Sequence, residues 1–306
     1  MGSSSIPNRP PATPDPELVA ALVAGQFPHL AGLCVTAIVP GGWDHRSFRL
    51  GDEMLVRLPS AAAYSGQAER EARWLPHLAP RLPLEIPAVV ALGEPGCGYP
   101  WKWSVRRWIE GETATLASTT HSTRVATRIA EFVDALHRID ARGGPAPGAH
   151  NFFRGGALST YDAEARKAIA ILAERIDAAT ALRLWDQAIR THWTHAPRWV
   201  HGDLAAGNFL MRDGALAAVI DFGCMGAGDP ACDLAVAWSL FRGEARRAFR
   251  AALHFDDATW ERARGWALWK AAIVAAGMSA TNAVEFADPW DVIEQVLGDP
   301  GGSGDE

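Results

Sequence analysis

Apolar residues follow two different spacings along this chain, and the change falls near residue 110. Before that point, runs of strand length alternate with turn signals, at 33–39, 47–50, 54–58, 86–92 and 103–109. A helix starts at Asp15 and Pro16, which are favoured as N-cap and first helical residue, and a long helix covers 66–78. The pattern predicts a small sheet that carries a single long helix.

Beyond residue 110 the apolar residues recur mostly at helical spacing. A stripe that begins at Ser122 extends to Ile139, and Ser159 with Asp162 forms the S-x-x-D pattern of a capping box for a helix to about 179. A strand–turn–strand is expected around Asp213, and further helices are expected up to 195 and at 229–241, 244–253, 259–281 and 288–297. These elements predict an α+β protein with a small β-rich part and a larger, mostly helical part.

The composition excludes several classes of protein. The 306 residues carry 29 basic and 35 acidic side chains, a net charge of −6, and no run of Lys or Arg forms the basic face that a nucleic-acid binder needs. The continuous apolar stretch 18–24 is too short to span a membrane, and the Ser- and Pro-rich start lacks a signal-peptide core. Four scattered cysteines indicate reduced thiols. We therefore expect a cytoplasmic protein without nucleic-acid or membrane partners.

The segment 201–223 carries the most specific chemical signal. Asp203 precedes Asn208 by the spacing of a kinase catalytic loop, and Asp221 begins an Asp-Phe-Gly tripeptide. A carboxylate at Asp203 can orient an attacking hydroxyl and accept its proton, and the hard oxygens of Asn208 and Asp221 suit Mg²⁺. A short hairpin between Asn208 and Asp221 would bring the two ligands together. The pattern predicts phosphoryl transfer.

The segments HGDLAAGN, IDFG and GDPACDLA resemble the aminoglycoside phosphotransferase family, a branch of the kinase-like fold, over about 18–297. The resemblance implies a two-lobed protein-kinase-like fold. The nucleotide-binding lobe is expected at 15–110, and the lobe with the catalytic loop and the acceptor site at 111–298. The tails 1–14 and 299–306 are expected to be disordered.

The same resemblance assigns roles within the motifs. It implies that Asp203 is the catalytic base, that Asn208 and Asp221 bind Mg²⁺, and that ATP or GTP donates the phosphate. His201 is expected to support the catalytic loop. Asp233 either braces that loop or is only a carboxylate in the first turn of a helix, which its position after Asp229-Pro230 also explains.

The first half of the chain offers a cation for the nucleotide phosphates. Arg57 stands where the family usually has lysine, and Glu71 on the following helix would hold it in place. Only three of the 29 basic residues are lysines, and an arginine can fork to two phosphate oxygens. The alternative is that Arg57 and Glu71 form an ordinary surface ion pair.

Other nucleotide contacts are less distinctive in sequence. Gly42 and Ser47 lie in a loop that could approach the phosphates, although it lacks G-x-G-x-x-G and also fits a plain hairpin turn. Arg107 and Ile109 lie where the family's interlobe hinge would bind adenine through backbone groups, and an edge strand fits them equally well.

The acceptor pocket is expected after residue 150 and in the C-terminal helices. Aminoglycosides are polycations, and the candidate carboxylates are Asp162, Glu164, Glu285 and Asp288. Capping offers a second explanation for Asp162 and Asp288. Trp266 and Trp269 share a helix face, which favours a place in the core over a platform for sugars.

The sequence thus predicts a Mg²⁺-dependent small-molecule O-phosphotransferase. It would move the γ-phosphate of a nucleotide to a hydroxyl of a cationic, aminoglycoside-like acceptor, with a role in antibiotic resistance. Alternatives are a kinase of another amino-bearing metabolite (choline, homoserine or a glycated amine) and a nucleotide-binding pseudokinase. Intact Asp203, Asn208 and Asp221 favour an enzyme, whereas Arg57 in place of lysine favours the pseudokinase. A monomer or a homodimer is expected.

Overall fold

The computed structural model describes residues 14–39, 42, 44–279 and 288–299. Two compact units make up the chain, one of residues 1–73 with 88–108, the other of residues 74–87 with 109–306. The predicted lobe boundary after Glu110 lies close to the end of the 88–108 segment. The assignment of 74–87 to the second unit has no counterpart in the sequence pattern.

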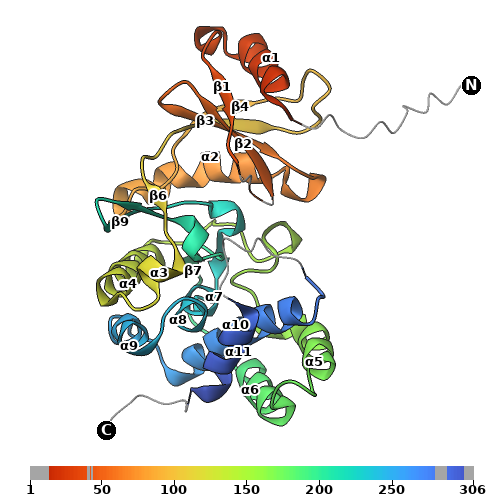
Figure 1. Cartoon of the computed structure of the whole chain (residues 1–306), viewed down its shortest axis with the longest axis vertical. Coiled ribbons are helices and arrows are strands. Elements are labelled where there is room, and N and C mark those ends of the chain that lie inside the picture. Colours follow the sequence, from red (N-terminus) through yellow and green to blue (C-terminus); the bar gives the residue numbers. More distant parts are fainter. Residues whose placement is uncertain (1–13, 40–41, 43, 280–287, 300–306) are drawn as a thin grey trace, which may run out of the picture. The chain divides into compact units, whose positions relative to one another are not determined.

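The first unit is built on an antiparallel sheet of five strands in the order β1-β2-β3-β5-β4 (Figure 1). Strands β2 and β3 are joined by a tight turn, with Leu50 opposite Met54 in the register. The strands are β1 (Val35–Ala37), β2 (His45–Leu50), β3 (Met54–Pro59), β4 (Val89–Gly93) and β5 (Trp103–Arg107). The expected small sheet is therefore present, although β1 and β4 are shorter than the apolar runs that predicted them.

Two helices accompany this sheet. Helix α1 (Pro16–Gln26) begins where Asp15 accepts a hydrogen bond from the backbone N–H of Leu18 at 2.8 Å, which confirms the predicted cap. Its buried face joins a core made by Val19, Leu22, Val23, Phe48, Leu50, Val56, Leu58, Tyr99, Trp103 and Val105. Helix α2 (Gln67–Leu78) is the predicted long helix and carries Glu71.

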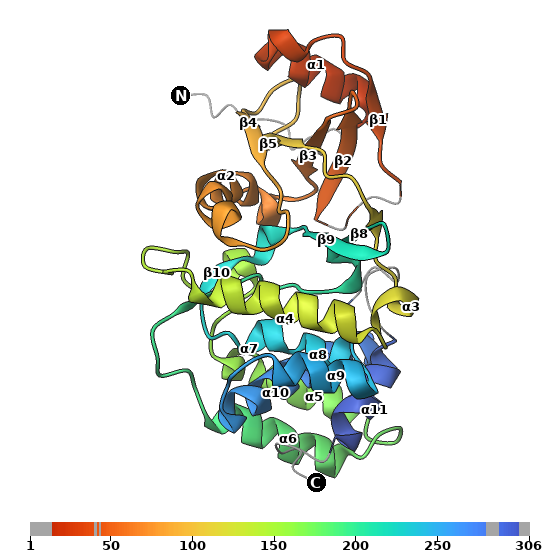
Figure 2. The same cartoon turned by 90° about the vertical axis from the view of Figure 1, so that its left-hand side faces the viewer.

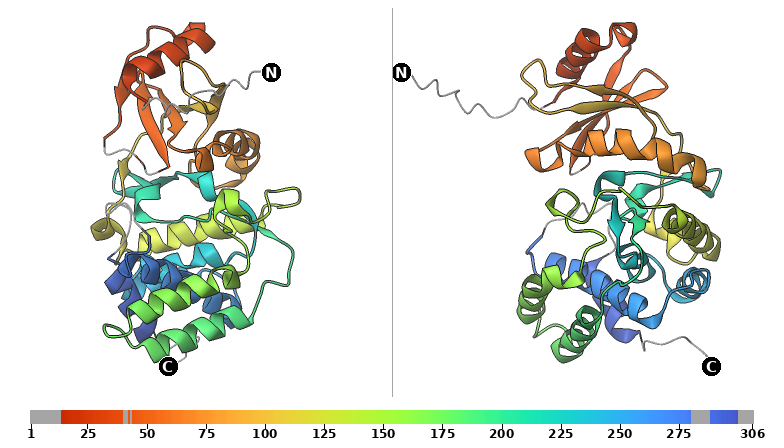
Figure 3. Two further views of the ribbon diagram at one scale, coloured as in Figure 1. Left: turned by 90° about the vertical axis from the view of Figure 1, so that its right-hand side faces the viewer. Right: turned by 180° about the vertical axis from the view of Figure 1, so that it is seen from behind.

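The second unit is mostly helical (Figure 2). Helix α10, which is buried along much of its length, packs against α5, α6, α7 and α11, and α4 packs against α9 (Figure 3). The helices are α3 (Leu116–Thr119), α4 (Thr123–Arg138), α5 (Asp162–Ile171), α6 (Ala178–Arg190), α7 (Ala231–Leu234), α8 (Val236–Ser239), α9 (Gly243–Ala251), α10 (Asp257–Ala275) and α11 (Pro289–Gly298).

Short strands hold the polar loops of this unit. A three-stranded sheet has the order β6-β8-β9, and β7 pairs with β10. The turn at Asp213 and Gly214 joins β8 to β9, which confirms the predicted strand–turn–strand. The strands are β6 (Glu112–Thr113), β7 (Arg198–Val200), β8 (Phe209–Arg212), β9 (Ala215–Val219) and β10 (Gly226–Gly228).

Two expectations drawn from composition can be compared with the structure. All four cysteines are free thiols, as their scattered positions predicted. No helix in the described ranges is long and apolar enough to cross a membrane.

Several predicted helix boundaries are wrong. The helix expected from 159 to about 179 is α5, which ends at Ile171, and α6 then begins after Asp177, whose side chain accepts from the N–H of Thr180. Helix α6 ends at 190 rather than 195. The segment 229–241 forms two short helices, α7 and α8, instead of one. The expected helix 259–281 begins at 257, and within the described residues it ends at 275.

The predicted capping box at Ser159 is also wrong. Helix α5 begins at Asp162 without a side-chain cap. The Asp162 carboxylate instead accepts hydrogen bonds from Trp185 Nε1 at 2.7 Å and from Arg166 Nε at 2.8 Å. Because Trp185 is fully buried in α6, Asp162 ties α5 to α6 by satisfying a donor that water cannot reach.

We predict that Asp162→Ala lowers the free energy of unfolding by about 1–3 kcal/mol, because the Trp185 N–H loses its partner. Ser159→Ala, the matched control, should stay within about 0.5 kcal/mol of wild type because the exposed Ser159 side chain caps nothing. Urea unfolding followed by far-UV circular dichroism measures both. Equal losses in the two variants would contradict this role of Asp162.

Candidate active site

Asp233 in α7 binds the backbone of the loop that carries Asp203. Its two carboxylate oxygens accept hydrogen bonds from the backbone N–H groups of His201 at 2.9 Å and Gly202 at 2.7 Å. The Nε2 atom of His137 lies 3.2 Å from the same carboxylate. Asp233 is fully buried, so these groups satisfy each other out of contact with water. Of the two interpretations of Asp233, the brace describes its contacts, although the residue also lies in the first turn of α7.

His201 joins two loops through both nitrogens of its ring. Its Nδ1 accepts from the backbone N–H of Asp203 at 3.2 Å, and its Nε2 lies 3.0 Å from the carbonyl oxygen of Ile220. A nitrogen beside an N–H must accept and one beside a carbonyl must donate, so this geometry selects the neutral Nε2–H tautomer. The ring also packs on Phe222, with centroids 4.6 Å apart. His201 therefore connects the loop of Asp203 to the loop of Asp221.

The two predicted metal ligands come together through the β8–β9 hairpin. The Asn208 side-chain amide donates to the backbone carbonyl of Asp203 at 2.8 Å. The backbone carbonyl of Asn208 accepts from the backbone N–H of Ile220 at 2.9 Å. Asp221 has a left-handed backbone, with φ of 67°, which is uncommon for a residue other than glycine. The Asp221 charge also acts on Asp203. Three predicted residues, Asp203, Asn208 and Asp221, thus lie in one neighbourhood.

Gly202 is required by a close approach of the backbone. Its φ is +82°, and a Cβ atom there would lie 2.7 Å from the carbonyl oxygen of Cys224 and 2.9 Å from Cβ of Arg154. No larger residue fits without movement of the Cys224 backbone. The glycine therefore allows the catalytic loop to lie directly beside the segment that carries Arg154.

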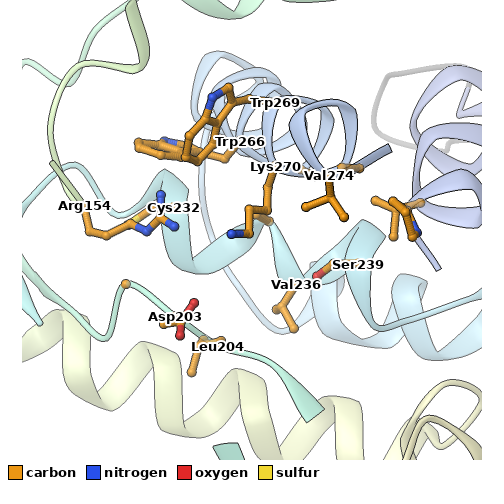
Figure 4. Close-up of a pocket in the computed structure, with 16 residues that line it drawn as sticks. Arg154, Asp203, Leu204, Cys232, Val236, Ser239, Trp266, Trp269, Lys270 and Val274 are labelled. Carbon is orange, nitrogen blue, oxygen red and sulfur yellow. The ribbon is translucent and has the colours of Figure 1, made fainter. Parts of the chain in front are cut away.

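Asp203 lines a cavity of about 80 Å³ in the second unit. The carboxylate of Asp203, the guanidinium of Arg154 and the ammonium of Lys270 point toward the same space (Figure 4). Burial raises the pKa of Asp203, and the negative charge of Asp221 adds to this effect, whereas the positive charges of Arg154 and Lys270 oppose it. The cavity thus combines a base of increased proton affinity with two cations.

The predicted acceptor carboxylates do not line this cavity. Asp162 is held by Trp185, Glu164 accepts from Trp269 Nε1 at 2.8 Å, and Asp288 caps α11 through the N–H of Trp290 at 3.0 Å. Glu285 lies outside the described residues. The cap predicted at Asp288 is confirmed. Among the described residues that line the cavity, the acidic one is Asp203.

Aromatic and basic residues line the cavity instead. Trp266 and Trp269 are 3 % and 4 % exposed, as expected for core residues, yet both also contribute to the cavity wall. Arg154 and Lys270 were not predicted to belong to the site. The one sequence signal for Lys270 is its position inside an apolar helix, next to Trp269 and Ala271. Arg154 lies in a Gly-rich loop with no distinguishing pattern.

In the first unit, Glu71 has a second partner that the sequence did not predict. Arg106 forms a bidentate pair with the fully buried Glu71 carboxylate, 3.1 Å from Nη1 to Oε1, while Arg57 Nη1 is 3.8 Å away. Burial by itself raises the pKa of Glu71, but Arg106 and Arg57 outweigh it and hold this pKa below its usual value. The surface ion pair is therefore wrong, because Arg57 is only 8 % exposed. Arg57 also lies 3.0 Å from His45 Nδ1 through its Nη2.

The remaining nucleotide-binding candidates fall in different places. Ser47 is opposite Arg57 in the β2–β3 register, and Gly42 precedes β2. Arg107 is the exposed last residue of β5 in the first unit. Ile109 belongs to the second unit, where it packs with Leu210 and Ala218.

Solved structures of phosphotransferases have the same fold. The GDP complex of aminoglycoside 2′-phosphotransferase-IIIa matches with a TM-score of 0.66 at 17% identity, over 93% of this chain and 99% of that chain. The GDP and kanamycin complex of a 2″-phosphotransferase matches with a TM-score of 0.67 at 17% identity, over 92% of this chain and 96% of that chain. A macrolide 2′-phosphotransferase from Brachybacterium faecium matches with a TM-score of 0.58 at 19% identity, over 95% of this chain and 99% of that chain. These likenesses show a kinase-like α+β fold.

A comparison with curated proteins gave no match. The model of the phosphotransferase enzyme family matches residues 36–266, which is more than half of the chain and includes Asp203, Asn208, Asp221 and Asp233. The matched region therefore contains most of the fold, the predicted catalytic-loop motif and the residues that brace this loop, and the chain belongs to the phosphotransferase enzyme family.

Proposed function

We propose that the protein transfers the γ-phosphoryl group of a nucleoside triphosphate to a hydroxyl group of a small molecule. The observation that carries this proposal is the placement of Asp203, a partly buried carboxylate at the edge of a cavity, on a loop that His201, Asn208 and Asp233 hold. The similar structures include complexes with GDP, ADP and ATP, which supports a nucleotide as the donor.

Asp203 has the chemistry of the proton acceptor. The hydroxyl oxygen of the acceptor forms a bond to the γ-phosphorus while the bond from this phosphorus to the β–γ bridging oxygen breaks, and the hydroxyl proton passes to Asp203. Burial and the Asp221 charge raise the pKa of Asp203, which increases its affinity for that proton. The hydrogen bonds of the loop place this carboxylate before substrate binds, so little reorganisation is needed.

The donor set at Asn208 and Asp221 suits Mg²⁺. Asn208 Nδ2 is used by the Asp203 carbonyl, which leaves its oxygen Oδ1 as a ligand, and Asp221 offers a carboxylate. Within the described ranges, no three or more His, Cys, Asp or Glu residues gather as a complete metal site, so phosphate oxygens would complete the coordination. When bound, the ion would neutralise charge on the phosphates.

Most of the residues that we assign to the nucleotide belong to the first unit. Arg57 is the proposed phosphate cation, with Glu71 and His45 fixing its guanidinium. Ser47 and Gly42 would contact the phosphates, and the chain near Arg107 and Ile109 would contact the base through backbone groups. Because Arg106 takes both oxygens of Glu71, its main effect is on the position of Glu71.

Aminoglycosides are the first acceptors to test, because similar structures are complexes with kanamycin, streptomycin and gentamicin. Activity on one of them would support a role in antibiotic resistance. A macrolide 2′-phosphotransferase is similar as well, so macrolides and amino alcohols belong in the same panel. The test is nucleotide consumption with each acceptor in the presence of Mg²⁺. Nucleotide binding without transfer to any acceptor would favour the pseudokinase.

We predict that Asp203→Asn and Asp221→Asn fail in different ways. Asp203→Asn removes the proton acceptor, so kcat should fall by roughly 10²–10⁴-fold with little change in the Mg²⁺ dependence. Asp221→Asn removes an anionic ligand, so half-maximal activity should also require more Mg²⁺. Titration of Mg²⁺ at fixed nucleotide, beside wild type, measures both effects. The reverse pattern would exchange the two roles, and full activity in both variants would end the kinase proposal.

A further prediction separates Arg57 from Arg106. Arg57→Ala should raise the nucleotide KM by about tenfold or more, and Arg57→Lys should recover part of this loss, because a charged contact to phosphate is lost in one and kept in the other. Arg106→Ala should lower Tm more than Arg57→Ala, since it leaves the buried Glu71 without its bidentate partner. Steady-state kinetics measure the nucleotide KM of each variant, and thermal unfolding measures its Tm. A normal KM in Arg57→Ala with a raised KM in Arg106→Ala would move the phosphate contact to Arg106.

A further inference from the structure

The cavity beside Asp203 contains buried hydrogen-bond donors that lack acceptors. Arg154 is 9 % exposed, and its Nε and Nη1 have no hydrogen-bond partner among the described residues. The Nε1 of Trp266, on the same wall, is also buried without one. A buried donor without an acceptor costs free energy, and a guanidinium costs more than a neutral group. The site is therefore suited to a ligand that supplies oxygen acceptors.

The charges in the cavity lead to the same conclusion. Arg154 and Lys270 point into one space, and burial together with the Arg154 charge lowers the pKa of Lys270 (Figure 4). The negative charges of Asp203 and Glu164 oppose this effect, and of these two carboxylates only Asp203 lines the cavity. A polycationic acceptor would enter against two positive charges. An anionic group would be attracted by both.

The rest of the wall is apolar and aromatic. The Arg154 guanidinium lies 5.1 Å from the ring centroid of Trp266 and 5.2 Å from that of Trp269, and Tyr161 stacks on Trp269 at 3.9 Å. Val236 and Val274 continue the wall. The cations therefore border a surface that suits an apolar or aromatic group.

We propose that the acceptor carries an anionic oxygen group, such as a carboxylate, next to an apolar or aromatic body. Arg154 and Lys270 bind the anionic group, Trp266 and Trp269 contact the body, and the hydroxyl reaches Asp203. This assignment of substrate class rests on the proposed phosphotransfer at Asp203. The same two cations are chemically suited to the phosphoryl group in transfer, and the test below separates these two anions.

The test uses three probes with the same hydroxymethylphenyl body and an anionic, neutral or cationic group opposite the hydroxymethyl: 4-(hydroxymethyl)benzoate, 4-(hydroxymethyl)benzamide and 4-(hydroxymethyl)benzylamine. Calorimetry on the full chain without nucleotide measures each Kd, so the result does not depend on turnover. We expect the benzoate to bind at least about tenfold more tightly than the other two, the usual effect of one charge-assisted hydrogen bond.

Variants assign this preference to the two cations. Lys270→Met keeps side-chain length without charge and should weaken benzoate binding to the level of the benzamide, whereas Lys270→Arg should restore part of it. Arg154→Gln should act in the same direction, and if it does not fold, the Lys270 pair decides. Lys167→Met is the matched control, because Lys167 is an exposed lysine on α5 that does not line the cavity, and it should change no Kd.

Tighter binding of the benzylamine or of kanamycin than of the benzoate overturns the proposal, as does no binding of any probe. An unchanged preference in Lys270→Met, with kcat lowered for every acceptor, also overturns it and assigns the cations to the transferred phosphoryl group. A benzoate preference that depends on Lys270, in a protein that phosphorylates nothing, supports the anion site while the proposed function fails.

Discussion

The buried carboxylate of Asp233 is the constraint on which the rest of the site depends. It accepts two backbone N–H groups of the catalytic loop, and no water is available to replace it. Because those N–H groups belong to His201 and Gly202, the carboxylate sets the direction in which the next residue, Asp203, leaves the loop. A carboxylate binds two N–H donors more strongly than a neutral acceptor does, so these hydrogen bonds hold the loop backbone firmly in one position.

Further hydrogen bonds connect the braced loop to its neighbours. The His201 ring contacts the Ile220 carbonyl, and the Asn208 side-chain amide donates to the Asp203 carbonyl. The loop of Asp203 is therefore held by hydrogen bonds between the side chains of Asp233, His201 and Asn208 and main-chain atoms, and the Asn208 side chain uses only its Nδ2 in this network. A site whose loops are fixed by such supporting hydrogen bonds keeps its reactive groups preorganised.

Buried arginines in the two units are balanced in different ways. Arg106 and Arg57 lie beside the Glu71 carboxylate, so the ion pair compensates their burial. Arg154 lies over indole rings instead, with two donors unsatisfied among the described residues. Asp203 supplies the carboxylate in the described cavity lining, and we assign it to catalysis. In the first arrangement a carboxylate compensates the buried cations. In the second, Arg154 has unsatisfied donors, and this difference motivates the proposed anion site.

The sequence by itself determined the features that depend on residues close together in the chain. The spacing of Asp203, Asn208 and Asp221 predicted a catalytic loop, and the helix caps at Asp15 and Asp288 follow from a carboxylate next to Pro at a helix start. Local hydrogen bonds span only a few residues, so their signals are visible in the pattern.

Only the tertiary structure decided the partners that are distant in sequence. Glu71 pairs with Arg106 as well as with Arg57, Asp162 binds Trp185 instead of capping its own helix, and Arg154 and Lys270 line the cavity where carboxylates were expected. Several side chains of suitable charge could form each of these contacts, and the one that does depends on which strands and helices pack together. That choice is a property of the whole fold, and no local pattern of residues records it.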